Sequence, residues 1–470
     1  MDLDACLEAA RAFDGSFRAR WEPVAAAAAS QVDGERLAAA WEEYTGRLQD
    51  NYPFFHPRYA GQMLKPPHPV AIAGYLAAMT VNPNNHALDG GPATGAMEKE
   101  VVVDLAAMFG LPGETLGHLT SSGTIANLEA LWVARQLAPG RAVAHSQDAH
   151  YTHARMCEVL GMESVAVPAD PAGRMDLDAL EPLLASGRVG TVVLTAGTTG
   201  LGAVDPIDEA LALRDRHGCR LHVDAAYGGF FALLAGDEDG AKLLGPETAA
   251  RLAAVGACDS VVVDPHKHGL QPYGCGAVLF RDPGVGRLYQ HDSPYTYFTS
   301  EELHLGEISL ECSRAGAAAG ALWLTLRALP LEARQGLGPV VAGGLRAARA
   351  WAELLEASDE LVLYQQPELD ILAFWPHPAT PSCAAVDAAS AGLLRTAMDD
   401  PSPVYLSTLR LAADRLRHRD PSLAADVGAA RVLRSVLMKP EHEGWVETLH
   451  AELLRILSAP DGRDGAALGR

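Results

Sequence analysis

The chain has 470 residues, of which 49% are hydrophobic and 20% are charged, so it can bury a large core and is not a disordered protein. Its 37 Lys and Arg residues against 59 Asp and Glu residues give a net charge of −22, which argues against nucleic acid and anionic membrane surfaces as main partners. A chain of this length is expected to form about two or three structural domains.

The N-terminal stretch lacks the basic-then-apolar layout of a signal peptide, and no apolar run reaches the roughly 18–20 residues that cross a bilayer. The seven cysteines are scattered and form no CxxC pair. This usage favours reduced thiols over a disulfide framework or a zinc module. We therefore expect a cytoplasmic protein.

Residues 1–50 are rich in Ala and are expected to be helical. Residues 51–95 contain many Pro, Gly, Asn and His around one short helical stretch, which is typical either of a wall of a functional site or of a long connection. From about residue 96, helical patterns alternate with short apolar runs rich in β-branched residues. The expected helices are 96–109, 124–137, 206–217 and 315–329, and the expected strands are RAVAHS (141–146), SVAVPA (164–169), GTVVLTAG (190–197), RLHVDA (220–225), DSVVVD (259–264) and GCGAVLF (274–280).

Apolar strands separated by helices predict an α/β fold with a mostly parallel central sheet, covered by helices on both faces. Residues 340–470 differ, because a long helix precedes the β-like runs LVLYQQ, ELDILAFW and VLRSVLM and a final amphipathic helix. This block is expected to be a smaller C-terminal α+β domain. The predicted division is a helical segment at 1–80, a large α/β domain at 81–340 and the small domain at 341–470.

Polar side chains follow several of the predicted strands, and ligands of such sheets bind beyond the carboxyl ends of the strands. The residues in these positions are His150, His153, Thr199, Asp224, Tyr227, His266, Lys267 and His268. Asp224 ends an apolar strand, where an aspartate can be a helix cap, a metal ligand or the partner of a cationic ring nitrogen.

The segment TSSGTIANLEALW places Ser122, Gly123 and Thr124 at the start of a predicted helix. A helix N-terminus offers free N–H groups and a positive dipole end to a phosphate, although the same residues also make an ordinary N-cap. Lys267, enclosed by His266 and His268, is a candidate Schiff-base amine, because partial burial lowers the pKa of a lysine and frees its lone pair. The competing interpretation is a metal site, but HExxH is absent and a lysine between two histidines does not favour a cation, so no metal is expected.

A phosphate cradle, an aspartate for a ring nitrogen, a stacking histidine and a Schiff-base lysine together are what pyridoxal 5′-phosphate requires. From about residue 50 to 455 the sequence resembles the pyridoxal-phosphate-dependent decarboxylases that include glutamate and aromatic-L-amino-acid decarboxylase. The segments that carry the resemblance are HPRYAGQM, SSGTIANLEAL, DAHYTHAR, TAGTTGLGAVDP, HVDAAYGG, DPHKHG, GCGAVLF and VLRSVLM. The resemblance implies the fold-type I, aspartate aminotransferase-like architecture of such enzymes.

The resemblance also assigns roles. Lys267 matches the Schiff-base lysine, Asp224 the partner of the pyridine nitrogen, and His150 the histidine stacked on the cofactor ring. Ser122, Gly123 and Thr124 match the phosphate cradle, Thr199 and His266 match further cofactor contacts, and Arg434 matches an arginine near the substrate carboxylate. Asp264, where some relatives have Asn, and His268, where relatives vary, receive no role; a carboxylate at 264 would repel the phosphate unless it pointed elsewhere.

In the family, a mobile loop after GCGAVLF brings a tyrosine to the active site of the neighbouring subunit. Aligning on Asp292 puts this tyrosine at Tyr295, with Tyr297 as the alternative, and implies a homodimer. A tyrosine there is suited to protonate the substrate Cα as a general acid. The expected reaction is α-decarboxylation of an L-amino acid to the amine and CO2.

Gln62 resembles a glutamine that contacts the side-chain acid in glutamate decarboxylase, which favours an acidic or polar substrate over an aromatic one. Tyr59, Phe54, Phe55 and His86 provide the alternative of an aromatic pocket. The alternative reactions on the same scaffold are aldehyde-forming oxidative deamination, carbon–carbon cleavage and transamination. A non-catalytic binding homologue is disfavoured because Lys267, Asp224 and His150 are all present.

Overall fold

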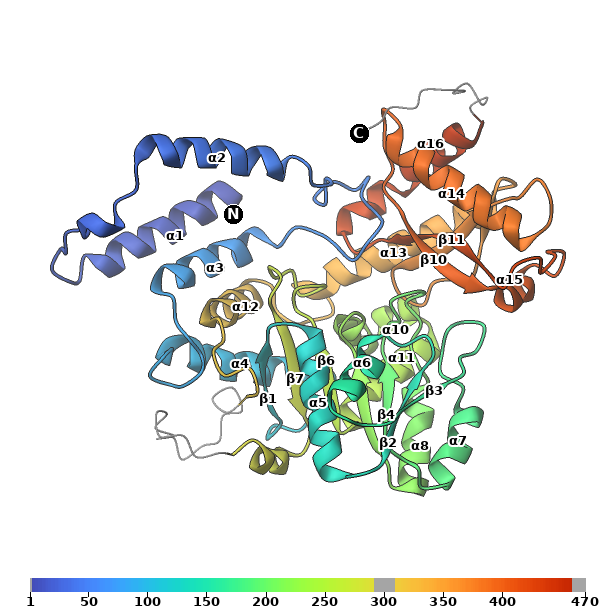
Figure 1. The fold of residues 1–470 in the computed structure, drawn as a ribbon, viewed down its shortest axis with the longest axis horizontal. Coiled ribbons are helices and arrows are strands. Elements are labelled where there is room, and N and C mark those ends of the chain that lie inside the picture. The colour runs from blue at the N-terminus through green and yellow to red at the C-terminus, as the bar shows by residue number, and fades with distance from the viewer. Residues whose placement is uncertain (1, 291–308, 459–470) are drawn as a thin grey trace.

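The computed structural model describes residues 2–290 and 309–458 and contains two β-sheets with helices packed on them (Figure 1). The larger sheet has seven strands in the order β1-β7-β6-β5-β4-β2-β3. Its strands are β1 (Leu116–Thr120), β2 (Ala142–Ser146), β3 (Ser164–Val167), β4 (Val189–Thr195), β5 (Arg220–Asp224), β6 (Ser260–Val263) and β7 (Gly276–Phe280). The five strands from β3 to β6 are parallel, whereas β7 is antiparallel to both of its neighbours, which confirms the mostly parallel α/β sheet.

The central strands form because their residues are apolar on both faces. Every residue of β4, β6 and β7 is buried, and β-branched valines dominate β6, as a sheet covered on both sides requires. The surrounding helices are α4 (Pro92–Phe109), α5 (Gly123–Leu137), α6 (Thr152–Val159), α7 (Leu177–Ala185), α8 (Ile207–His217), α9 (Ala232–Ala235), α10 (Glu238–Leu244), α11 (Pro246–Ala253) and α12 (Gly316–Ala328).

All six strands expected for the large sheet are present, and the sequence pattern misses only β1. This strand, LGHLT, contains Gly117 and His118, which weaken its apolar pattern. It is nevertheless buried at every position, because the His118 ring forms a 2.9 Å hydrogen bond with the Glu129 carboxylate of α5. A long-range partner therefore makes possible a buried histidine that the local pattern argues against.

The smaller sheet has four antiparallel strands in the order β10-β11-β9-β8. They are β8 (Leu361–Leu363), β9 (Ile371–Pro376), β10 (Ser407–Ala412) and β11 (Ala429–Val436), and the associated helices are α13 (Leu337–Glu356), α14 (Cys383–Asp399), α15 (Ala413–Arg419) and α16 (Val446–Ser458). The α+β character predicted for this part of the chain is confirmed. The edge strand β10 is not predicted, because exposed Thr408 and Arg410 interrupt its apolar residues.

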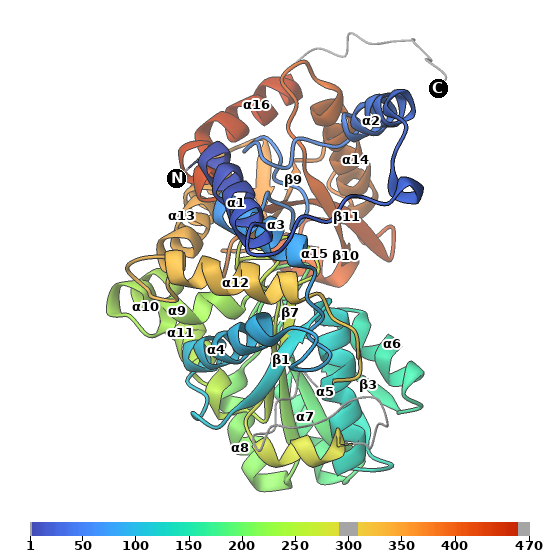
Figure 2. The same cartoon turned by 90° about the vertical axis from the view of Figure 1, so that its left-hand side faces the viewer.

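Residues 2–50 contain two α-helices, in agreement with the helical structure expected there. Helix α1 (Leu3–Arg18) packs on α3 (Pro69–Val81), which in turn packs on α12. Helix α2 (Gly34–Leu48) extends along the edge of the molecule and buries none of its residues (Figures 1 and 2). Within the described residues, no helix combines the length and apolar character that crossing a membrane requires. The division of the chain at residues 80 and 340 stays a prediction.

Candidate active site

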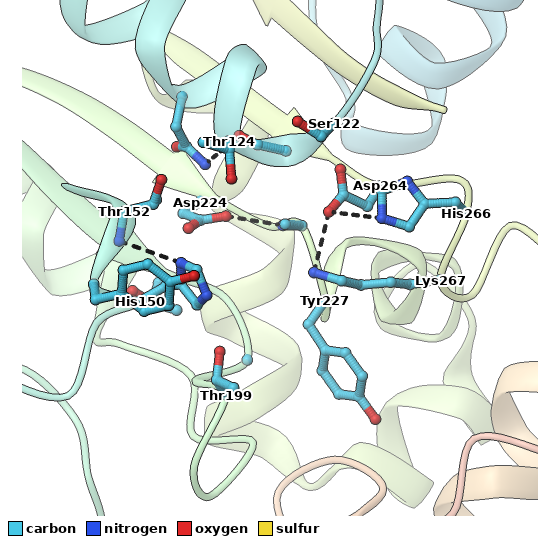
Figure 3. A pocket seen from close by; sticks show the side chains of 16 residues that line it. Ser122, Thr124, His150, Thr152, Thr199, Asp224, Tyr227, Asp264, His266 and Lys267 are labelled. Carbon is cyan, nitrogen blue, oxygen red and sulfur yellow. Dashed lines mark hydrogen bonds and ion pairs between the residues drawn. The ribbon is translucent and has the colours of Figure 1, made fainter. Parts of the chain in front are cut away.

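A cavity of about 280 Å³ opens where β4, β5 and β6 end, beside the start of α5 (Figure 3). This is the edge at which parallel sheets place their ligands. The cavity is lined by every residue predicted to contact the cofactor, namely Ser122, Gly123, Thr124, His150, Thr199, Asp224, His266 and Lys267. These residues come from five separate parts of the sequence, and the sheet brings them together.

The start of α5 forms one wall of the cavity from backbone groups. Ser122 is the N-cap, and its Oγ accepts a 3.4 Å hydrogen bond from the Ile125 N–H. The first N–H groups of a helix have no partner inside the helix, so those of Gly123 and Thr124 are available to an anion. Gly276 allows β7 to pack here, since a Cβ at this position would come within 2.6 Å of the Ser122 carbonyl carbon.

Asp224 is a buried carboxylate at the end of β5. Its Oδ2 accepts a 2.9 Å hydrogen bond from His153 Nε2, and its Oδ1 accepts one of 3.1 Å from the Ala226 N–H. Burial by itself raises the pKa of Asp224, but the His153 contact, the charge of Lys267 and the Ala226 N–H together hold this pKa below its usual range. Asp224 is therefore a stable anion inside the cavity, suited to a cationic ring nitrogen.

Lys267 extends into the cavity from the turn after β6. Its Nζ lies 3.1 Å from Oδ2 of Asp264, and His266 Nε2 lies 3.5 Å from the same oxygen (Figure 3). Asp264 thus points into the cavity and not away from it. Its carboxylate lies so close to Gly123 that a Cβ there would come within 2.6 Å of Oδ2.

The two histidines of the cavity differ in how their rings are held. His150 Nδ1 accepts a 3.3 Å hydrogen bond from the Thr152 N–H, whereas His266 Nδ1 donates to the Cys275 carbonyl at 2.8 Å. Burial lowers the pKa of both rings, which favours their neutral forms. The neutral His150 ring therefore carries its proton on Nε2 and can lie against an aromatic cofactor without adding a charge.

A second cavity of about 450 Å³ adjoins the first and shares His150, Tyr151 and Thr199 with it. Gln62 and Arg434, the two residues predicted to contact the substrate, both line it. The Arg434 guanidinium is buried, and Nε and Nη1 donate only to neutral oxygens, including Gln62 Oε1 at 3.5 Å. Nη2 has no hydrogen-bond partner among the described residues, so this cation has room for an anionic ligand.

The aromatic residues of the segment before α3 do not line either cavity. Tyr59 packs edge-on against Phe54 with ring centroids 4.8 Å apart, and it also contacts Tyr52 and Tyr405. These ring contacts hold the segment beside the small sheet. The Ala60 N–H supports the same placement, because it donates to the Tyr405 carbonyl at 2.9 Å. The alternative of an aromatic pocket built from Tyr59 thus has no support in these contacts.

Several residues near the cavity received no role from the sequence. His153 contacts Asp224 from behind, and His268 forms a buried network in which its Nε2 lies 2.9 Å from an Asp370 oxygen and Tyr227 donates to the other. The His153–Asp224 and His268–Asp370 contacts join residues that are 71 and 102 positions apart, so the sequence gives no signal for them. The only visible signal is that His153 follows His150 by three residues, about one helical turn. Tyr295 and Tyr297 lie outside the described residues. No cluster of His, Cys, Asp or Glu in residues 2–290 and 309–458 is arranged to hold a metal ion.

The side chains of the first cavity fit pyridoxal phosphate. The free N–H groups at the start of α5 suit the phosphate, the anionic Asp224 suits a protonated ring nitrogen, and Lys267 suits the aldehyde. The buried Asp264 Oδ1, which has no hydrogen-bond partner among the described residues, places a charge that is unfavourable to a phosphate near this wall.

Comparison with known proteins gives the same result at the level of the family. Residues 54–377 match the family model described as the pyridoxal-dependent decarboxylase conserved domain. The chain is 30% identical to an L-tyrosine decarboxylase of Enterococcus faecium, over 64% of each protein. It is 32% identical to a probable L-tyrosine/L-aspartate decarboxylase of Methanothermobacter thermautotrophicus, over 68% of this chain and 84% of that protein. The chain thus spans less than two thirds of the length of the first relative.

The fold has counterparts among solved structures. The crystal structure of mouse CSAD superposes with a TM-score of 0.75 at 24% identity, covering 91% of this chain and 89% of the other. This likeness shows a shared fold, that of the fold-type I enzymes expected from the sequence.

Proposed function

This chain belongs to the pyridoxal-dependent decarboxylase family, and we propose that it removes the α-carboxyl group of an L-amino acid as CO2 and releases the corresponding amine. Its cofactor is pyridoxal phosphate. The observation that carries the proposal is that the Lys267 amine, the anionic Asp224 and the start of α5 face one cavity of about 280 Å³. These are the three groups that the aldehyde, ring nitrogen and phosphate of the cofactor need.

When bound, pyridoxal phosphate supplies an aldehyde that condenses with amines and a conjugated ring that delocalises the electron pair left at Cα after CO2 departs. The protein supplies the groups around it. Lys267 would provide the amine for covalent attachment of the cofactor. Asp224 holds a proton on the ring nitrogen, because its low pKa makes it a poor acceptor of that proton and a strong electrostatic partner for the cation.

We assign the orientation of the cofactor to two further elements. The N–H groups of Gly123 and Thr124, with the Ser122 hydroxyl, hold the phosphate at the start of α5. The neutral His150 ring would stack against the ring of the cofactor, and Thr199 and His266 would complete the contacts. Since the departing carboxylate has to stand perpendicular to the ring plane, this fixed plane selects which bond of the substrate breaks. We keep Tyr295 as the general acid that returns a proton to Cα.

For the substrate we propose an amino acid with an acidic side chain. Arg434 is a buried cation whose hydrogen bonds all go to neutral oxygens, and Gln62 lies beside it in the adjoining cavity. A cation on the departing carboxylate would stabilise the ground state and oppose loss of CO2, so Arg434 is better suited to a carboxylate that stays on the substrate. The names of the relatives include both tyrosine and aspartate, and Arg434 favours the aspartate-like class.

We also propose that the protein acts as a homodimer. Helix α2 carries Leu37, Trp41, Tyr44 and Leu48 at spacings of four, three and four residues, which places them on one face, and all four are exposed. An unpaired apolar stripe of this kind is a typical contact surface, and a second copy of the chain is the partner that the family resemblance implies.

The cysteines of the chain are all free thiols, which supports the expectation of a reducing, cytoplasmic compartment.

The experiment that tests the function is incubation of the purified holoprotein with a panel of L-amino acids, with CO2 and amine both measured. We expect equal amounts of CO2 and amine, with L-aspartate or L-glutamate as the best substrates. Aldehyde with ammonia, a keto acid, or cleavage between Cα and Cβ would replace decarboxylation by one of the other reactions of this scaffold. A protein that binds pyridoxal phosphate but transforms no amino acid would contradict the enzymatic assignment.

A further inference from the structure

We propose that His153 is a positioning residue that acts through Asp224, holding this carboxylate in the orientation and charge state that the ring nitrogen of the cofactor requires. The inference rests on the proposed function in one respect only, which is that the cavity binds pyridoxal phosphate. It concerns how strongly and in which protonation state the cofactor is held.

The turn that leads into α6 (Thr152–Val159) presents two imidazoles to different places. The His153 N–H donates to the His150 carbonyl at 3.2 Å, so the two residues share this turn. His150 lines the cavity, whereas His153 is fully buried behind Asp224, with Nε2 at 2.9 Å from Oδ2. Asp224 therefore separates His153 from the cavity, and His153 reaches a bound ligand only through this carboxylate.

The hydrogen bonds around His153 fix where its proton lies. Its Nδ1 is buried and has no hydrogen-bond partner among the described residues. A proton on Nδ1 would leave a buried donor unsatisfied, whereas a proton on Nε2 is donated to a carboxylate. The hydrogen bond to Asp224 therefore uses a proton on Nε2 of His153.

The contacts also fix the carboxylate plane. His153 Nε2–H donates to Oδ2 and the Ala226 N–H donates to Oδ1, so each oxygen of Asp224 has one donor on the protein side. A carboxylate oxygen accepts about two hydrogen bonds, which leaves acceptor capacity on the cavity side. The ring nitrogen then meets an anion whose orientation is set before the cofactor binds, as preorganisation requires.

Removal of the His153 donor would change the basicity of Asp224. Burial favours the neutral form of this carboxyl group, and the donors from His153 and Ala226 oppose it. Without His153, Asp224 becomes a better acceptor for the proton of the ring nitrogen, and the electrostatic attraction between the two weakens. The other ionisable groups around the pair are His145 on β2, His222 on β5, His150 on the turn before α6, and Lys267.

The experiment compares two variants with two cofactors. His153→Leu removes the donor and keeps the approximate volume, whereas the amide of His153→Gln reaches the position of Nε2 and keeps a donor. Each apoprotein is titrated with pyridoxal phosphate and with its analogue that has carbon in place of the ring nitrogen. The dissociation constants do not depend on any decarboxylation activity.

We expect His153→Leu to bind pyridoxal phosphate roughly 10- to 100-fold more weakly than the wild type, the range of a hydrogen bond to a charged group, and His153→Gln to recover most of this loss. Binding of the carbon analogue should be nearly equal in all three proteins. An equal loss with both cofactors would show a merely structural role and overturn the proposal, as would no loss with either.

Two controls keep the outcomes distinct. If His153→Leu does not fold, as judged by circular dichroism, His153→Asn replaces it, because its shorter amide does not reach Asp224 and the same selective loss is expected. If the wild-type protein binds neither cofactor, the proposed function fails, and this result differs from any failure of the role of His153.

Discussion

The Lys267 amine lies 3.1 Å from Oδ2 of Asp264, and both side chains face the cavity beside the start of α5. Before the cofactor binds, the ammonium group balances the charge of this carboxylate. If Lys267 is used for covalent attachment of the cofactor, Asp264 remains close to the start of α5, which we propose as the phosphate site. Two negative groups then share one region, and the positive end of the α5 dipole offsets part of their repulsion.

We therefore predict that Asp264→Asn, which removes the charge and keeps the shape, strengthens phosphate binding by about fivefold, or about 1 kcal/mol, as expected for like charges partly screened by solvent. The measurement is the affinity of the apoprotein for pyridoxine 5′-phosphate, which has no aldehyde and leaves Lys267 free. The matched control is Asp387→Asn on the surface of α14, which should change nothing. Weaker binding by Asp264→Asn would mean that the carboxylate organises the site more than it repels the phosphate.

Substrate choice provides a second prediction. Arg434→Met should lower kcat/KM for an acidic amino acid roughly 10- to 100-fold, because the charge-assisted hydrogen bonds to the substrate carboxylate are lost. The activity toward L-tyrosine, where present, should fall much less. Arg431→Met is the control, because Arg431 lies on the same strand but pairs with Asp387 at the surface. Equal losses for both substrates would assign Arg434 to the α-carboxylate that all amino acids share.

The large sheet and the residues that line the first cavity could be predicted because their signals are local. β-branched runs mark β4 and β6, and the polar residues at strand ends follow directly in the sequence. The order of these strands then brings Asp224, Lys267 and the start of α5 together at one edge, as the rule for parallel sheets requires.

What the sequence could not provide depends on contacts between distant residues. His118 weakens the apolar pattern of β1, and only its contact with Glu129 explains why the strand is buried. The partner of His153 is Asp224, which lies 71 residues away on β5. The direction of the Asp264 side chain is likewise a property of packing. It points toward Gly123 because the turn that carries Lys267 lies against the start of α5, and no sequence pattern encodes that approach.

The stability of the protein should depend on pH through buried histidines. His442 Nε2 donates to the Pro57 carbonyl at 3.1 Å and Nδ1 accepts from the Lys439 N–H at 3.3 Å, so the ring is held neutral. Burial, followed by the nearby Lys439, lowers the pKa of His442 to about 3. Between about pH 3 and 6.5 the unfolded chain therefore binds a proton that the folded chain does not, and stability falls as the pH falls.

The expected contribution of His442 is a loss of about 1.4 kcal/mol in unfolding free energy per pH unit below about 6.5. His442→Gln keeps a donor for Pro57 but does not titrate. The slope of its unfolding free energy against pH should therefore be smaller than that of the wild type by the contribution of about one proton over this range. Urea titrations at a series of pH values measure both profiles. Parallel profiles for the variant and the wild type would show that the folded protein already binds this proton.

Because the apolar stripe on α2 is the proposed dimer contact, charged substitutions on it should weaken the dimer. Leu37→Glu combined with Trp41→Glu should shift the dimer toward the monomer, because the exposed stripe would then carry two charges. Ala39→Glu, on the opposite face of the same helix, should leave the dimer unchanged. Sedimentation equilibrium of the three proteins decides the point. A monomeric wild type, or a dimer that tolerates the double substitution, would contradict the proposed interface.

The most direct test of the central claim is one reaction of the holoprotein in D2O with an acidic L-amino acid labelled with carbon-13 in its α-carboxyl group. We predict one labelled CO2 for each amine, a single deuterium on the carbon that lost the carboxyl group, and no product from Lys267→Ala. Label retained in a keto acid or in unchanged amino acid with an exchanged Cα hydrogen, or turnover by Lys267→Ala, would contradict decarboxylation in this cavity.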